Sequence, residues 1–261
     1  MKLGNSLLAL CLTLTLPAGA AVIGVNFSEN NANQGWLATT SSVGPLGTSS
    51  AYFNNTNNPT GGPANSHTGT LASGTLGDLV DDSGAAVSGM TVTFNSSNPW
   101  YTASGTATNQ AILDAGYLDD GGSGVSITVN NIPYAQYNIY ILLGSDQGAG
   151  STYTTRDFKV NGTWILDGGT GVTSSSTATA YKFFGAGGSN PYAAATTLQT
   201  GHYLLAQVQT GSTLTIEGVT RNGAERGTIS GFIIQEVPEP ASAALGGLGL
   251  LALMIRRTRR G

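Results

Sequence analysis

The chain has 261 residues, of which 9% are charged and 38 are glycine, and its formal net charge is −4. Residues 21–236 hold five basic and thirteen acidic residues, a formal charge of −8, which leaves no basic surface for binding nucleic acid. The apolar fraction of 40% comes in patterned blocks, which excludes a disordered chain and predicts one large β domain.

The N-terminal segment, residues 1–20, has the three parts of a signal peptide. Lys2 supplies positive charge, an apolar run covers residues 7–16, and Pro-Ala-Gly-Ala ends the segment. An A-x-A site of this kind predicts cleavage by signal peptidase before Ala21. The single cysteine, Cys11, lies in the removed part; its lipidation is the alternative, which the apolar residues that follow it disfavour. The mature chain would then have neither a disulfide nor a thiol nucleophile.

Alternation of apolar and polar residues predicts about ten strands in the body of the chain. The expected strands cover residues 23–27, 90–94, 125–129, 137–143, 158–160, 164–166, 181–184, 203–208, 213–217 and 228–235. The run at 137–143 is almost continuously apolar, as in a central strand buried on both faces. Asn161-Gly162 predicts a tight hairpin. Without long helices, the pattern predicts an all-β fold, a single jelly-roll-like β-sandwich over residues 21–236.

Long loops are expected on both sides of the strand at 90–94. Residues 28–70 are poor in aliphatic side chains, and a short strand is expected there near Ala51–Phe53. Residues 105–118 could hold one helical turn, at 109–115. Long loops on a rigid sandwich are where binding usually occurs.

Aromatic residues in the predicted loops are candidates for sugar binding, because an aromatic ring can stack on a sugar while nearby amides or acids bind its hydroxyls. Partial burial explains the same residues equally well, since tryptophan is seldom fully exposed. Trp164 lies inside an apolar hairpin and is predicted to belong to the core. The candidate ligand-binding residues are Trp36, Trp100, Tyr101 and Tyr117.

Two acidic loops are candidates for Ca²⁺, which prefers carboxylate and carbonyl oxygens on flexible loops. Neither has the spacing of an EF-hand, and turn chemistry alone explains Asp-Asp-Gly sequences. We therefore expect no cofactor, with Ca²⁺ as the alternative. The residues concerned are Asp78, Asp81, Asp82, Asp119 and Asp120.

Catalytic motifs are missing from the sequence. It contains no G-x-S-x-G, H-E-x-x-H, Walker A or CxxC pattern, and its two histidines, His67 and His202, could form a triad only if the fold brought them together. A glycosidase would need two facing carboxylates, which could come from Asp114, Asp119, Asp120, Asp146 and Asp157. We expect no catalytic residue and no enzymatic activity, with a glycan-active enzyme as the less favoured alternative.

The C-terminal segment combines Val237-Pro238-Glu239-Pro240, a charge-free apolar run over residues 241–255, and the arginines Arg256, Arg257, Arg259 and Arg260. As a helix, this run would span about 22 Å, whereas a permanent transmembrane helix needs about 20 residues. By the positive-inside rule the arginines hold the C-terminus in the cytoplasm, so the body would lie outside. The short helix predicts a transient anchor in the membrane.

This C-terminal segment resembles the PEP-CTERM sorting signal, in which the Pro-Glu-Pro motif, a short helix and a basic cluster follow in this order. The resemblance covers about the last tenth of the chain. It implies recognition by an exosortase at Val237–Pro240, removal of the tail, and delivery to the cell surface or the exopolysaccharide matrix. Residues 237–261 would then be absent from the mature protein.

The body is similar to a β-sandwich module of exported PEP-CTERM proteins from Verrucomicrobia and Planctomycetes. The segments that carry this looser resemblance are 23–27, Leu79–Gly84, Gly116–Leu118, 137–140 and 229–234. We expect an exported protein at the cell surface or in the extracellular matrix that associates with exopolysaccharide. The alternative is a lectin-like carbohydrate-binding module; its ligand is not implied by fold alone.

Overall fold

The computed structural model describes most of the predicted β body. The described residues are 20–27, 42–49, 52–56, 72–101, 116–119, 124–143, 154–155, 157–166, 172–173, 183–186, 199–200, 203–219 and 225–238. They form strands almost throughout, with almost no helix, so the all-β class is confirmed.

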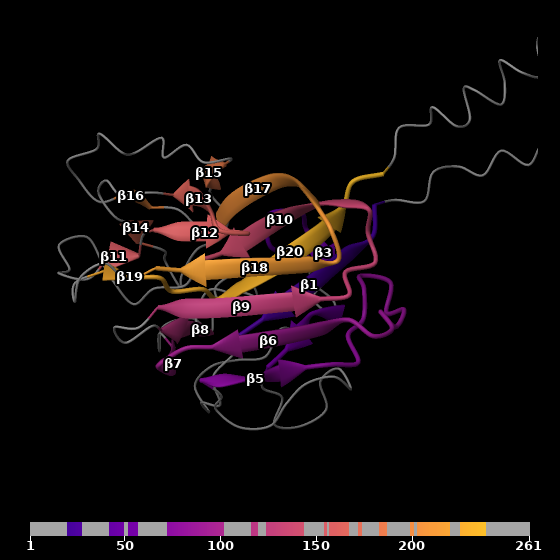
Figure 1. The fold of residues 1–261 in the computed structure, drawn as a ribbon, viewed down its shortest axis with the longest axis horizontal. Coiled ribbons are helices and arrows are strands. Elements are labelled where there is room, and N and C mark those ends of the chain that lie inside the picture. Colours follow the sequence, from indigo (N-terminus) through magenta and orange to yellow (C-terminus); the bar gives the residue numbers. More distant parts are fainter. Residues whose placement is uncertain are drawn as a thin grey trace, which may run out of the picture.

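The first of two large sheets has six strands and carries both ends of the β body (Figure 1). Its order is β15 (Phe183–Ala186), β17 (Tyr203–Thr210), β10 (Gln136–Leu142), β20 (Gly231–Glu236), β1 (Val22–Asn26) and β4 (Asn54–Asn55). The outermost pairs, β15 with β17 and β1 with β4, are parallel, and the inner pairs are antiparallel. As the sequence predicts, the apolar strand β10 is central.

The second large sheet also has six strands, and all its pairs are antiparallel. It lies in front of the first sheet in Figure 1. Its order is β13 (Thr163–Leu166), β12 (Phe158–Val160), β18 (Thr213–Gly218), β9 (Val125–Asn130), β6 (Thr91–Asn95) and β5 (Ser73–Leu76). Asn161 and Gly162 join β12 to β13 with φ values of 50° and 73°, as expected for the predicted Asn-Gly hairpin.

Three smaller sheets complete the described residues. One has four strands in the order β16 (Gln199–Thr200), β14 (Val172–Thr173), β11 (Thr154–Thr155) and β19 (Glu225–Arg226). The other two are pairs: β2 (Ser42–Val43) with β3 (Thr48–Ser49), and β7 (Asn98–Tyr101) with β8 (Gly116–Asp119).

One hydrophobic core lies between the two large sheets. It contains the inward residues of β1, β10, β17 and β20 from the first sheet and those of β5, β6, β9, β12, β13 and β18 from the second. Phe27 joins the layers, because its ring centroid lies 5.2 Å from that of Phe94 and 6.2 Å from that of Phe232. The strict alternation in β6 and β9 leaves every second side chain of the second sheet outside this core.

A second, smaller cluster covers the other side of the first sheet. Val22, Phe53, Leu142 and Ile233 are buried there, which explains why β1 and β10 are apolar on both faces. Phe53 packs on Gly24, where an added Cβ would lie 2.8 Å from the ring. Among the described residues, no apolar cluster covers the outer side of the central strands of the second sheet, where only the inner face is apolar.

Two sequence predictions need correction. The short strand expected near Ala51–Phe53 lies instead at Asn54–Asn55, where the Asn54 side chain bonds the Gly24 and Val80 backbones. Strand β5 was not predicted, and the residues of β7 and β8 were placed in loops or at their edges, because a short strand with few aliphatic side chains shows no clear alternation. The helical turn expected at 109–115 lies outside the described residues, and the single jelly-roll-like sandwich of about ten strands stays a prediction.

Candidate functional site

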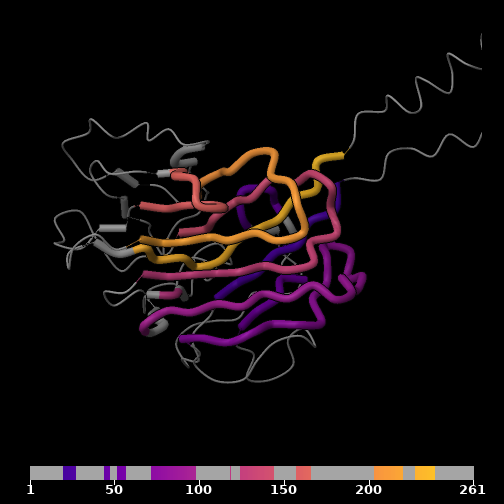
Figure 2. Tube along the Cα trace, in the orientation of Figure 1, coloured from indigo at the N-terminus to yellow at the C-terminus, as the bar shows by residue number. Residues whose placement is uncertain are grey.

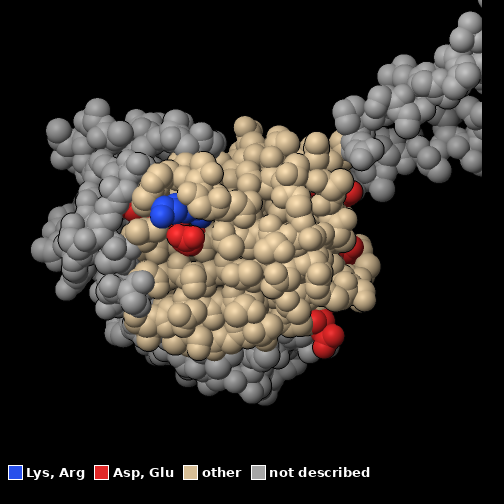
Figure 3. Space-filling view, viewed as in Figure 1, with Lys and Arg blue, Asp and Glu red and all other residues tan. Residues whose placement is uncertain are grey.

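The outer side of the second sheet is a polar face. Paired residues of neighbouring strands point to the same side, so its side chains form rows across the strands. The long row takes one residue from each of the six strands: Ser73, Asn95, Ser126, Glu217, Lys159 and Trp164. The threonine row, two residues further along, consists of Thr75, Thr93, Thr128 and Thr215. Figure 3 shows this face toward the viewer, with few charged atoms.

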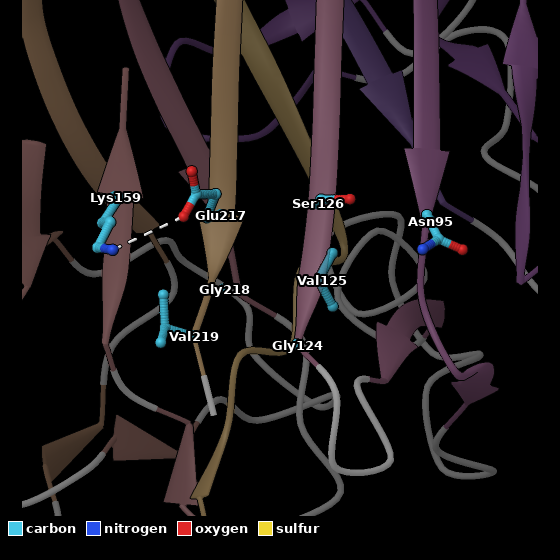
Figure 4. Close-up of a pocket in the computed structure, with 8 residues that line it drawn as sticks. All are labelled: Asn95, Gly124, Val125, Ser126, Lys159, Glu217, Gly218 and Val219. Atoms are coloured by element: carbon cyan, nitrogen blue, oxygen red, sulfur yellow. Dashed lines mark ion pairs between the residues drawn. The ribbon is translucent and has the colours of Figure 1, made fainter. Parts of the chain in front are cut away.

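A pocket of about 340 Å³ lies at one end of this face, where β6 and β18 end and β9 begins. We call it the end pocket. Figure 4 shows its four polar side chains on four neighbouring strands, so the pocket contains the middle of the long row. Its lining residues are Asn95, Gly124, Val125, Ser126, Lys159, Glu217, Gly218 and Val219.

Lys159 connects the polar groups of the pocket to an aromatic ring. Its Nζ lies 3.8 Å from Glu217 Oε2 and 4.4 Å from the centroid of the Trp164 ring. The two charged side chains are 27% and 39% exposed, so their pairing contributes at most about 1 kcal/mol to stability. Because this contribution is small, Lys159, Glu217 and Trp164 are more relevant to ligand binding than to stability. They offer a ligand a cation, a carboxylate acceptor and an aromatic surface beside amide and hydroxyl groups.

The prediction that Trp164 belongs to the core is wrong. Trp164 is paired with Lys159 across the hairpin, and it is half-buried on the polar face. The core position of β13 is taken by Ile165, which is 3% exposed. An apolar run of three residues does not show which of them points inward, because one step along a strand reverses the face.

The structure brings three of the four candidate aromatic residues together. Trp100 is paired with Tyr117, and Tyr101 with Gly116, in the two-stranded sheet β7–β8. These residues therefore lie in strands rather than in the predicted loops. Strand β7 begins three residues after Asn95, a pocket residue. Trp36 lies outside the described residues.

The first acidic loop uses its carboxylates within the fold. Asp81 Oδ1 accepts hydrogen bonds from Ser83 Oγ at 2.6 Å, Ser83 N at 2.9 Å and Ala85 N at 3.0 Å. Partial burial raises the pKa of Asp81, but these hydrogen bonds outweigh it and hold the pKa below its usual value. Asp82 Oδ1 accepts from Val22 N at 3.1 Å. The contacts of Asp81 are those of a turn, whereas the contact of Asp82 joins the loop to the start of β1.

Calcium binding stays a prediction. Asp78 is exposed with a φ of 51°, Asp119 is in β8, and Asp120 lies outside the described residues. Within the described ranges, no group of three or more His, Cys, Asp or Glu side chains is placed to hold a metal ion.

The candidate catalytic residues are not assembled in the part of the chain that can be described. Asp157 is fully buried just before β12 and does not line the end pocket. Glu217 is the single carboxylate among the described residues that line this pocket, whereas the usual glycosidase mechanism needs two. His67, His202, Asp114 and Asp146 lie outside the described residues.

Sequence reasoning missed the polar residues of the end pocket: Asn95, Ser126, Lys159 and Glu217. Ser126, Lys159 and Glu217 fall within predicted strands, next to apolar residues, which was the available signal. Asn95 lies one residue beyond the predicted strand 90–94. Their meeting depends on the order β12-β18-β9-β6, which joins segments up to 122 residues apart between Asn95 and Glu217. Alternation within one strand carries no information about its neighbour.

The C-terminal segment is the part of the chain that matches a known family. Residues 236–260 match the model of the PEP-CTERM protein-sorting motif. No curated protein and no solved structure gives a significant match to the chain. The motif indicates an exported protein, sorted by an exosortase, with a membrane-anchored C-terminal signal. The sorting signal and the exosortase partner are therefore confirmed, whereas the likeness of the body to modules of Verrucomicrobia and Planctomycetes stays a prediction.

The motif begins at the last residue of the fold. Glu236 ends β20, Val237 N donates to the Gln136 carbonyl at 2.9 Å, and Pro238 is exposed. In the described part of the chain, no helix is long and apolar enough to cross a membrane. The predicted membrane segment 241–255, its arginines and residues 1–19 of the signal peptide lie outside the described residues.

Proposed function

We propose that this exported protein is a non-enzymatic polysaccharide-binding protein of the cell surface or extracellular matrix, and that the end pocket holds the sugar. The observation that carries the proposal is the combination of Glu217, Lys159, Asn95 and Ser126 in one exposed pocket of an exported protein, with the Trp164 ring beside Lys159.

The chemistry of the pocket suits a sugar. A pyranose ring has hydroxyl groups that both donate and accept, and C–H faces that are apolar. Glu217 accepts hydrogen bonds, Lys159 donates them, and Asn95 and Ser126 do both. Trp164 supplies an aromatic face next to these groups, with its ring already held by Lys159 at 4.4 Å. The arrangement requires neither a metal nor a cofactor, so we propose that binding needs none.

The proposed function includes cleavage of the C-terminal sorting signal. The exosortase would cut the chain at Val237–Pro240 after export, and the body would leave the membrane for the surface or the exopolysaccharide layer. Strand β20 ends at Glu236, so a cut within Val237–Pro240 leaves all the described strands intact.

Binding can be tested on the exported protein isolated from the cells that make it. The probe is exopolysaccharide purified from the same cells, and the measurement is the apparent Kd from co-sedimentation. We expect Glu217→Gln and Trp164→Ala each to weaken binding about tenfold. The first replaces one carboxylate oxygen acceptor with an amide donor and removes the charge, and the second removes the stacking surface. Trp100→Ala tests whether β7 contributes to the same site.

The matched control is Gln207→Ala, since Gln207 is an exposed strand residue on the first sheet, away from the polar face. Its Kd should equal that of the wild type. A wild-type protein that does not bind the exopolysaccharide at all would contradict the proposal, as would full affinity in both Glu217→Gln and Trp164→Ala. Release of shortened sugars from the polymer would replace it with the enzyme alternative.

A further inference from the structure

The threonine row is a regular array of hydroxyl groups. Thr75, Thr93, Thr128 and Thr215 are aligned by the register of four neighbouring strands. Strands lie about 4.8 Å apart, so the row is about 14 Å long, and the long row runs parallel to it about 6.8 Å away. The Oγ1 atoms of Thr75 and Thr93 are 3.1 Å apart and share a hydrogen bond.

The polar face is open. Thr75 and Thr93 are exposed and Thr128 and Thr215 are half-buried, and Figure 3 shows the face uncovered. A third row, formed by Thr91, Asn130 and Thr213, continues it beyond the threonines. A ligand that fills the end pocket therefore has a hydroxyl-lined surface directly beside it.

Sheet stability alone accounts for part of this pattern. Threonine has a high β propensity, and cross-strand threonine pairs stabilise a sheet. Sheet stability does not account for the lack of charged side chains on the polar face, because exposed sheets normally carry charged side chains that keep them soluble and unpaired. Among the described residues of the three rows, only Lys159 and Glu217 are charged, and they pair with each other.

The side chains of the polar face indicate which class of ligand it can bind. A polyanion would meet a body with a formal charge of −8 and no unpaired cation on the described part of the face. A protein partner would need an anchoring core of aromatic, Met or Arg residues, which the threonine row does not offer. An uncharged polymer with many hydroxyl groups suits both the hydroxyls and the methyl groups of the threonines.

We propose that the threonine row is a docking track for one extended, uncharged polysaccharide chain that passes across the strands beside the end pocket. The inference rests on the proposed function and deepens it, because it names the class of polymer and the surface that the polymer covers.

The test replaces hydroxyl groups without changing the shape of the face. In the exported protein we expect the triple variant T93V/T128V/T215V to bind the uncharged fraction of the exopolysaccharide at least about tenfold more weakly, because three hydroxyl groups no longer bond the polymer. Valine keeps the β-branched shape and the β propensity, so the melting temperature should change little. The matched control is Thr210→Val, an exposed threonine of β17 on the first sheet, which should bind like the wild type.

The possible results separate the two proposals. If the wild type binds and Glu217→Gln weakens binding while the triple variant does not, the docking track is wrong and the pocket stands. If the wild type binds no exopolysaccharide, the proposed function itself fails. The inference is overturned if the wild type binds the acidic fraction of the exopolysaccharide more tightly than the uncharged one. It is also overturned if the wild type forms a dimer that the triple variant does not form. Should the triple variant not fold, T93V and T215V alone, each expected to weaken binding about threefold, decide the question.

Discussion

Gly218, which lines the end pocket, lies against Gly227. An added Cβ at either residue would overlap the backbone of the other, so the chain can pass at this point only without side chains. Glycine in a strand often marks such a close approach of two backbones. The contact holds the end of β18, and with it Glu217, against the segment that leads into β20.

Gly218→Ala should therefore destabilise the fold. Because the Cβ would meet backbone rather than a flexible side chain, we expect a loss of about 1–3 kcal/mol, the usual cost of overpacking, measured by urea unfolding. Gly77→Ala is the matched control, since no atom lies within 4 Å of the added Cβ, and it should change stability by less than about 0.5 kcal/mol. Equal unfolding midpoints for the two variants would contradict this account.

At the scale of elements, β1 and β20 bring the two predicted processing sites together. The strands are paired from Val22↔Gln235 to Asn26↔Gly231, and Figure 2 shows the start of β1 and the end of β20 at the same edge. Beyond the last pair, Glu236 N donates to the Ala21 carbonyl at 2.9 Å, and Ala21 N lies 3.4 Å from Glu236 Oε2. Burial raises the pKa of the nearby Tyr134, and the charges of Asp81, Glu236 and Asp82 raise it further.

Cleavage before Ala21, as the sequence predicts, should strengthen this contact. It would turn the Ala21 amide into a charged ammonium group facing the Glu236 carboxylate. We expect Glu236→Gln to lower the melting temperature of the processed protein by about 2–4 °C, which corresponds to about 1 kcal/mol in a domain of this size. N-terminal acetylation, which removes the positive charge, is the control. Acetylation should lower the melting temperature of the wild type by the same amount and leave that of E236Q unchanged. An unequal loss would show that the charge pair is not the cause.

For the whole molecule, the sorting signal directly adjoins the folded body. Glu236 is both the last residue of β20 and the first of the matched motif. Four residues separate it from the predicted membrane segment at 241, a reach of about 14 Å when extended. The exosortase would thus act in a narrow gap between the β body and the membrane, on a proline-rich stretch that cannot join a strand.

Replacing Pro238, Glu239 and Pro240 by alanine should block processing. We expect this variant to remain in the membrane fraction at its uncut mass, whereas mass spectrometry of the wild type should find a chain without Arg256–Arg260. Gln207→Ala serves again as the control and should be processed normally. A wild-type mature protein that keeps its arginines would refute removal of the tail.

Strands β18 and β13 show where alternation predicts the buried face of a strand and where it does not. In β18 the alternation of Leu214 and Ile216 with threonines already identified the buried face, because that face must be apolar. In β13 the run Trp164–Leu166 has no alternation, and its inward residue was misjudged. Ligand binding by Trp100 and Tyr117 stays a prediction. Their pairing in β7–β8 arises from a contact between separate segments that local patterns do not contain.

The sequence alone determined the class of fold and the export of the protein. A sorting signal is read as a linear segment, so Pro238-Glu239-Pro240, the apolar run and the arginines show export without any knowledge of the fold. The polar rows and the end pocket were decided only by the tertiary structure. Their residues come from distant segments, and strand order and register, set by packing of the shared core, bring them to one face.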